Sequence, residues 1–200
     1  MVFKSSGFLN KGITFVEVII VISVIAILSL LSFPYYNDIR NTLALDRTAA
    51  QIVQDIRRAQ EMAMSAHQTT SGGNGTLHIP AGGYGVYFTD DSESYTIFGD
   101  EKPNPSNPNS TPNNYRNPNG EEDIEDVLVE ENVWISDLKD SSDTSRNTIS
   151  TTFLAPNPKV FLQDGNTGLG PEVKIRVSLK SDSSRFRDIK VNKAGLIWIE

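Results

Sequence analysis

The feature that constrains this chain most is an apolar run close to its start. Residues Ile13 to Phe33 read ITFVEVIIVISVIAILSLLSF, in which Glu17 is the one charged residue. At about 1.5 Å per residue, a helix of this length extends roughly 30 Å and can cross the hydrocarbon core of a bilayer. The sequence therefore predicts a transmembrane helix over residues 13–34.

The residues before this run indicate its orientation and its processing. Lys4 and Lys11 precede it, so the positive-inside bias places the N-terminus in the cytoplasm and the remainder of the chain outside. A secretory signal has its small cleavage-site residue after a shorter apolar stretch, whereas Gly12 lies before the run. Cleavage at Gly12 would therefore leave the anchor attached to the protein.

Glu17 needs a partner if it lies within a membrane. A carboxylate in a membrane span costs about 3 kcal/mol on insertion scales unless another group neutralises it. The alternative is a plain single-pass anchor in which Glu17 lies near the interface and is solvated. Either way, the sequence predicts a membrane-tethered chain.

Lys11-Gly12, followed by Ile13-Thr14-Phe15-Val16-Glu17, resembles the class III signal of type IV pilins and type II secretion pseudopilins. This resemblance implies that a prepilin peptidase removes the leader 1–12 by cutting between Gly12 and Ile13. It implies further that Ile13, where the family usually has Phe, becomes N-methylated. Glu17 then occupies the acidic position that sets subunit register.

The resemblance also implies a function. We expect a minor pilin or pseudopilin that is held in the inner membrane by one span, with its C-terminal domain on the extracytoplasmic or periplasmic side. Its partners would be other pilin subunits, the prepilin peptidase, the inner-membrane assembly platform and membrane lipid. A different hypothesis is a tethered domain that never polymerises.

The remainder of the chain predicts an α+β, pilin-like fold. Residues 35–70 contain an amphipathic helix, because apolar side chains recur at helical spacing from Asn41 to His67. Residues 71–200 read as a β-rich domain, and the economical arrangement packs the helix on an antiparallel sheet. Arg57-Arg58-Ala59 and Lys193-Ala194-Gly195 resemble the corresponding parts of GspH/FimT-type minor pseudopilins.

Alternating and apolar runs predict the strands, and turn residues predict the breaks between them. Ser71 to Gly75 should end the helix. Residues 100–120, rich in Pro and Asn, should form a disordered surface loop. The strands are expected at Tyr84–Phe88, Ser94–Phe98, Asn132–Ile135, Thr151–Leu154, Lys159–Leu162, Glu172–Lys180, Arg187–Val191 and Leu196–Ile199, with Gly195 in the last turn.

No pattern of residues predicts catalysis or a cofactor. The chain has no cysteine, and its two histidines, His67 and His78, read as surface residues, so we expect no enzyme and no cofactor. Asp90, Asp91 and Glu93, or the acidic run Glu121 to Glu131, offer oxygens that calcium prefers, but they lack EF-hand spacing. We therefore expect no metal site.

A locally basic C-terminal region leaves a second function open. The formal net charge of -7 argues against a surface that binds nucleic acid as a whole. Some FimT-type relatives bind DNA through a basic C-terminal region, so a competence-type subunit is the alternative. Its DNA contacts would come from Lys174, Arg176, Lys180, Arg185, Arg187 and Lys190, although several of these residues could simply form the solvated face of a strand.

Overall fold

The computed structural model describes residues 12–70, 77–101, 114–116, 122–154, 159–165 and 167–200, and for residues 31–35 it describes only the backbone. Contacts divide the chain into two units, Met1–Arg40 and Asn41–Glu200. The helix α1, Phe15–Met64, contributes residues to both units. All strands belong to the second unit, which is an α+β domain.

Helix α1 ends at Met64, six residues before the predicted end at residue 70. Ala66 adopts a left-handed conformation with φ of 50°. The N–H of His67 donates to the carbonyl of Met62 at 3.0 Å, and the N–H of Ala66 donates to that of Ala63 at 3.2 Å. Such a C-terminal cap usually uses glycine at the left-handed position. The prediction of helix up to residue 70 is wrong because alanine takes this role, ahead of the glycines at 72 and 73.

The strands form two antiparallel sheets rather than the single sheet expected. The larger has the order β3-β2-β1-β5-β6-β7 and the smaller the order β10-β9-β8-β4. The strands are β1 Gly83–Thr89, β2 Ser94–Asp100, β3 Asp123–Leu128, β4 Val133–Asp140, β5 Thr148–Leu154, β6 Lys159–Asp164, β7 Thr167–Gly168, β8 Glu172–Leu179, β9 Phe186–Asn192 and β10 Ile197–Ile199.

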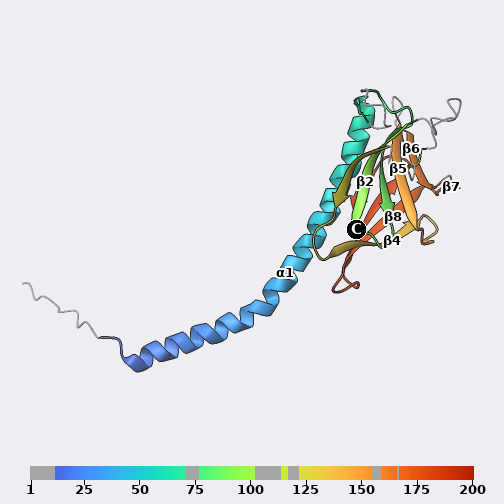
Figure 1. Cartoon of the computed structure of the whole chain (residues 1–200). Coiled ribbons are helices and arrows are strands. Elements are labelled where there is room, and N and C mark those ends of the chain that lie inside the picture. Colours follow the sequence, from blue (N-terminus) through green and yellow to red (C-terminus); the bar gives the residue numbers. More distant parts are fainter. Residues whose placement is uncertain (1–11, 71–76, 102–113, 117–121, 155–158, 166) are drawn as a thin grey trace, which may run out of the picture. The chain divides into compact units, whose positions relative to one another are not determined.

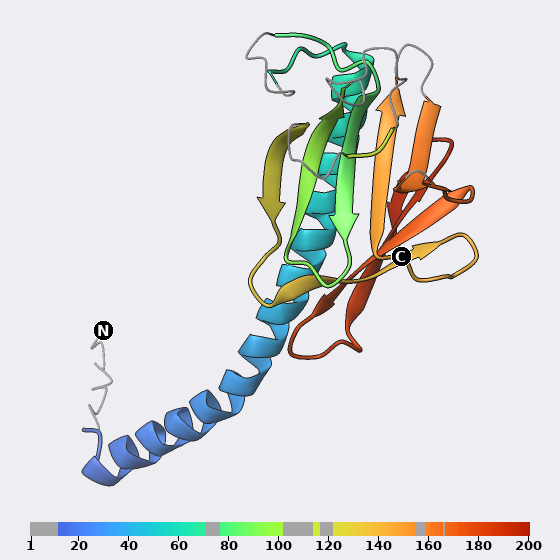
Figure 2. The same cartoon turned by 45° about the vertical axis from the view of Figure 1, so that its right-hand side comes forward.

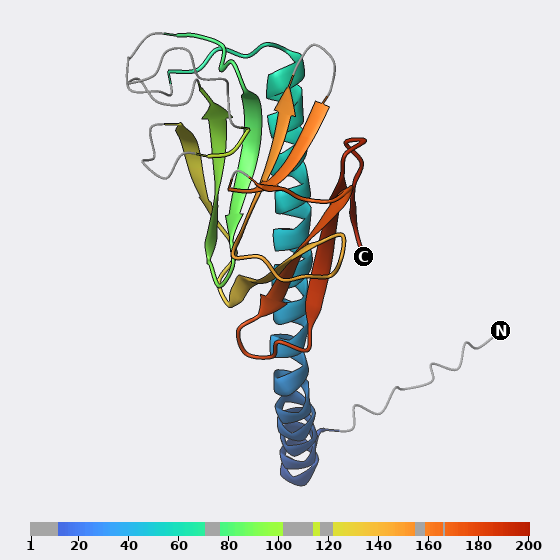
Figure 3. The same cartoon turned by 90° about the vertical axis from the view of Figure 1, so that its right-hand side faces the viewer.

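The helical residues 41–64 lie along one side of these strands, as three views of the domain show (Figures 1, 2 and 3). Their apolar stripe is buried in one core with side chains from both sheets. The stripe comprises Leu45, Ala49, Ile52, Val53, Ile56, Ala59 and Ala63. Each Å² of apolar surface that is buried stabilises the fold by about 25 cal/mol, and this contribution is the main force that holds the helix to the sheets.

Polar contacts fix the helix to both sheets. The phenol of Tyr95 on β2 donates to Asp55 at 2.5 Å, and burial together with the Asp55 carboxylate raises the pKa of this phenol. Arg58 pairs with Glu125 on β3 at 2.7 Å, and Arg187 on β9 pairs with Asp46 at 2.9 Å. The helix therefore bridges an edge strand of the larger sheet and a strand of the smaller one.

Most predicted strands are confirmed, including the hairpin β1–β2 and the terminal hairpin β9–β10, in which Gly195 has φ of 81°. The acidic run is an exception, because residues 123–128 form the edge strand β3, which is not among the expected strands. Most of the expected loop 100–120, and the predicted helix stop at 71–75, lie outside the described residues. Within that loop, residues 114–116 are described and contact the larger sheet.

Candidate functional site

The predicted cleavage site lies in non-helical chain directly before α1. Gly12, Ile13 and Thr14 have no regular secondary structure, and the helix begins at Phe15. The side chain of Ile13 is 75 % exposed, and the space around the Cα of Gly12 is open. The leader 1–11 lies outside the described residues. The bond between Gly12 and Ile13 is thus exposed and non-helical, as a peptidase substrate must be.

Glu17 lies in the first turn of α1 and completes a helix-start pattern. The hydroxyl of Thr14 accepts a hydrogen bond from the backbone N–H of Glu17 at 3.3 Å. Thr14-Phe15-Val16-Glu17 matches the capping box, in which a Thr precedes the helix and a Glu stands three positions later. A carboxylate in the first turn also interacts favourably with the helix dipole. Glu17 therefore has a local structural role open to it, besides any role in assembly.

From Phe15 to Leu30 the helix exposes apolar side chains all round. The exposed large side chains are Phe15, Val16, Val18, Ile19, Ile20, Val21, Ile22, Val24, Ile25, Ile27, Leu28 and Leu30. Ser23 and Ser29 donate their hydroxyls to the carbonyls of Ile19 and Ile25, at 2.7 and 2.8 Å. These hydroxyls are satisfied within the helix, as an apolar environment requires.

Within the described part of the chain, no helix offers a segment long and apolar enough to cross a membrane. The apolar run of the sequence continues through residues 31–33, whose side chains lie outside that part. Membrane crossing by residues 13–34 therefore stays a prediction.

The six cations nominated for DNA binding do not form one free basic surface. Five of them pair with a carboxylate, and the sixth, Arg185, donates to the hydroxyl of Thr42. The pairs are Lys174–Asp143 at 3.1 Å, Arg176–Asp188 at 2.7 Å, Lys180–Glu93 at 2.7 Å, Arg187–Asp46 at 2.9 Å and Lys190–Glu200 at 2.5 Å. Phosphates would have to displace these built-in carboxylates before they could bind.

The cations also point in different directions. Lys174 on β8 lies opposite Lys190 on β9, and both are on the face of the smaller sheet that turns away from the core. Arg187 lies on the other face, because its register partner Val177 is fully buried and its guanidinium reaches Asp46 on the helix. The structure thus brings Lys174 and Lys190 together and separates Arg187 from them.

The histidines and acidic groups considered as ligands do not gather into one site in the described part of the chain. His78 pairs with Glu101, and the exposed His67 accepts the phenol of Tyr84 at its carbonyl, at 2.5 Å. Burial and the nearby Glu101 carboxylate raise the pKa of Tyr84 to about 12. Among the described residues, no group of three or more acidic or histidine side chains could hold a metal ion.

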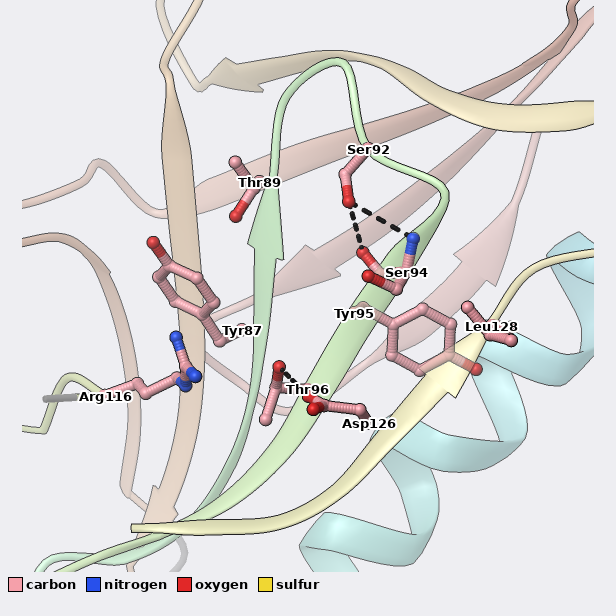
Figure 4. A pocket seen from close by; sticks show the side chains of 9 residues that line it. All are labelled: Tyr87, Thr89, Ser92, Ser94, Tyr95, Thr96, Arg116, Asp126 and Leu128. Atoms are coloured by element: carbon pink, nitrogen blue, oxygen red, sulfur yellow. Dashed lines mark hydrogen bonds between the residues drawn. The ribbon is translucent and has the colours of Figure 1, made fainter. Parts of the chain in front are cut away.

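The sequence analysis missed a polar hollow on the larger sheet. It has a volume of about 430 Å³ and lies on the face of β1, β2 and β3 that turns away from the core (Figure 4). Tyr87, Thr96 and Asp126 form a row across these strands, because Tyr87 pairs with Thr96 and Thr96 pairs with Asp126 in the register. The other lining residues are Thr89, Ser92, Ser94, Tyr95, Arg116 and Leu128. We refer to this site as the hollow.

Arg116 lines one side of the hollow, and its segment, residues 114–116, is fastened to the sheet. The backbone N–H of Asn114 donates to Asp100 at 2.6 Å, and its carbonyl accepts the hydroxyl of Thr152 at 2.9 Å. Arg116 makes two 2.5 Å hydrogen bonds to Asp123 and lies 5.1 Å from the ring centre of Tyr87. Arg116 therefore has a defined position beside Tyr87, as Figure 4 shows.

Asp100, which holds this segment, is a buried acid. Both Asp100 and its neighbour Glu122 are almost inaccessible to solvent, at 0 % and 2 % exposure. Burial, and then the charge of Glu122, raises the pKa of Asp100 to about 8. The Oδ1 atom of Asp100 has no hydrogen-bond partner among the described residues. The fold therefore favours the protonated form of Asp100 at pH values where an exposed aspartate is already ionised.

No family model, curated protein or solved structure matches this chain.

Proposed function

We propose that the chain is a prepilin-like minor subunit of a type II secretion or type IV pilus-like filament, with a structural rather than an enzymatic role. In this proposal a prepilin peptidase cuts after Gly12 and methylates Ile13. The apolar segment from residue 13 holds the subunit in the lipid of the inner membrane, where the assembly platform is its partner. It then packs among other subunits, with the domain 41–200 outside the cytoplasm.

The observation that carries this proposal is the helix from Phe15 to Leu30. Its apolar side chains are exposed in every direction, and its serine hydroxyls are bonded to its own backbone. A helix that is apolar all round needs an apolar environment, which lipid or a bundle of neighbouring helices provides. The exposed, non-helical Gly12–Ile13 bond directly before it supports processing there.

Glu17 supplies the chemistry for assembly in this proposal. Cleavage after Gly12 creates a positively charged amine on Ile13. The Glu17 carboxylate of a neighbouring subunit neutralises it, because two opposite charges in an apolar layer each lower the cost of burying the other. A subunit displaced along the filament would leave both charges unpaired. The pair therefore sets the axial register between subunits.

Processing is tested by co-expressing the full chain with a prepilin peptidase and measuring the intact mass. We expect a loss of about 1.3 kDa, the mass of residues 1–12, with the product remaining in the membrane fraction. Gly12→Leu is the matched control, and it should keep the full mass because a bulky residue replaces the small one at the cut. An unchanged mass of the unsubstituted chain would refute the proposal.

The role of Glu17 is tested by replacing it with Val. The span becomes more apolar, so membrane insertion should persist, while incorporation into filaments should fall because the Ile13 amine loses its partner. Glu17→Gln, which keeps the shape and removes the charge, should behave like Glu17→Val. Normal incorporation of both variants would show that the charge is dispensable.

The alternative, a competence-type subunit that binds DNA, stays a prediction. The carboxylate partners of five nominated cations give no support to it.

A further inference from the structure

The hollow presents an unusual density of hydroxyl groups. Thr89, Ser92, Ser94 and Thr96 line it, and Asp126 adds a carboxylate. The Thr96 hydroxyl donates to Asp126 at 2.6 Å, and the Ser92 hydroxyl donates to the carbonyl of Ser94 at 2.8 Å. Each hydroxyl oxygen has two lone pairs and a carboxylate has about four acceptor sites, so these internal bonds leave acceptors open.

The charged residues that line the hollow disfavour the binding of an anionic ligand. Arg116 is the one cation in its lining, and its guanidinium makes two hydrogen bonds to Asp123. That pairing neutralises the charge of Arg116. It also occupies the two N–H donors that would otherwise hold a phosphate or a carboxylate. Asp126 then gives the site a net negative charge, which repels anions. A phosphate-containing ligand, nucleic acid included, is thereby disfavoured.

The size and the rim of the hollow suit a small, neutral ligand with polar and apolar faces. Its volume of about 430 Å³ falls in the range of small-molecule sites, roughly 300–1,000 Å³. Leu128, 74 % exposed, and the ring of Tyr87 supply apolar surface beside the hydroxyls. A sugar ring has this dual character, with hydroxyls at its edge and C–H groups on its faces.

We propose that the hollow binds a neutral saccharide, with Asp126 accepting hydrogen bonds from two sugar hydroxyls and Thr89 and Ser94 completing the polar contacts. The carboxylate is the strongest acceptor in the site, because charge-assisted hydrogen bonds are about twice as strong as neutral ones. This inference rests on the domain 41–200 and is independent of the proposed role in a filament. A short cationic peptide, attracted by Asp126, is the competing ligand.

The test measures binding to the full chain in dodecylphosphocholine micelles, a detergent without a sugar head group. The saccharide probes are maltotriose, lactose and N,N′-diacetylchitobiose at millimolar concentration, and trilysine is the cationic peptide. Saturation-transfer NMR detects the binding of each probe. We expect at least one saccharide to bind. Asp126→Asn should weaken that binding on the order of tenfold, because a charge-assisted acceptor is lost.

Two further variants separate a lost contact from a lost fold. Thr89→Val removes one exposed hydroxyl at constant shape and should weaken saccharide binding severalfold without altering thermal unfolding. Glu131→Gln makes the same charge change as Asp126→Asn at an exposed position outside the lining, and affinity should stay unchanged. Binding of trilysine alone, no saccharide binding, or saccharide binding that is insensitive to Asp126→Asn and Thr89→Val would overturn the proposal.

Discussion

The two halves of α1 share one backbone conformation and differ in what surrounds their side chains. Between Phe15 and Leu30 the apolar residues are exposed on every side of the helix. Between Leu45 and Ala63 the apolar residues form one stripe, which is buried against the sheets, while Arg57, Glu61 and other polar residues remain exposed. The distribution of apolar residues around a helix therefore indicates its environment, whereas helical propensity alone does not.

The largest expected difference between the halves is the change in the free energy of unfolding when one isoleucine side chain in each half is truncated to alanine. Ile52 is fully buried and Ile22 is 60 % exposed. Ile52→Ala should lower the free energy of unfolding of the domain by about 2–5 kcal/mol, through lost transfer energy and a cavity, whereas Ile22→Ala should leave it unchanged. Both tryptophans, Trp134 and Trp198, belong to the domain, so their fluorescence during urea unfolding reports this quantity. Equal losses in the two variants would contradict the comparison.

The helical conformation and the buried stripe of the second half could be predicted from the sequence because they depend on spacing along one helix. Strands with strict alternation, such as β8 with Val173, Ile175 and Val177 buried, are predictable for the same reason. Strand β3 was missed because Asp123, Glu125 and Asp126 interrupt its apolar residues. It is an edge strand, where charged residues are tolerated and discourage pairing with another chain.

The hollow and the buried acid could not be predicted from local pattern. Tyr87, Thr96 and Asp126 come together through the register of three strands, and Arg116 comes from a segment whose composition suggested disorder. Asp100 and Glu122 are likewise far apart in the sequence and meet only in the fold. Register and long-range packing are tertiary properties, which local spacing does not encode.

The second prediction concerns pH, which should affect the domain through Asp100. The pKa of Asp100 is about 8 in the folded domain and near 4 when unfolded, so the folded state keeps a proton that the unfolded state loses between these values. The free energy of unfolding should therefore fall as pH rises from about 4 to about 8, by at most about 1.4 kcal/mol per pH unit.

The matched variant for this titration is Asp100→Asn, which imitates the protonated acid. Urea unfolding of both proteins at several pH values should show a smaller decline for the variant. Differences between the two proteins isolate the contribution of Asp100 from those of the other ionisable groups in the domain. Parallel pH profiles would show that Asp100 ionises normally in the fold.

The third prediction concerns the first turn of α1. It separates two roles of Glu17, helix capping and the proposed pairing with the Ile13 amine. Thr14→Val removes the hydroxyl that caps the N–H of Glu17, at a typical cost of about 1 kcal/mol to the first turn. Hydrogen exchange of the Glu17 amide should accelerate roughly fivefold, while filament incorporation stays normal. Ser23→Ala, which removes only a hydroxyl bonded to the preceding turn, is the control. Loss of incorporation in Thr14→Val would mean that Glu17 acts by capping the helix rather than by pairing with Ile13.

The smallest effect lies within the second half of α1, where neighbouring arginines differ in their partners. Arg58 pairs with Glu125 at 2.7 Å, whereas Arg57 is exposed and has no partner among the described residues. Both members of the pair are about half exposed, so solvent screens the attraction. Arg58→Ala should cost about 0.2–1 kcal/mol of unfolding free energy, and Arg57→Ala should cost less. Urea unfolding at low and high salt checks the cause, because high salt should remove the difference between the variants. A difference that persists in high salt would assign it to packing of the Arg58 side chain against β3 rather than to the charge of its guanidinium.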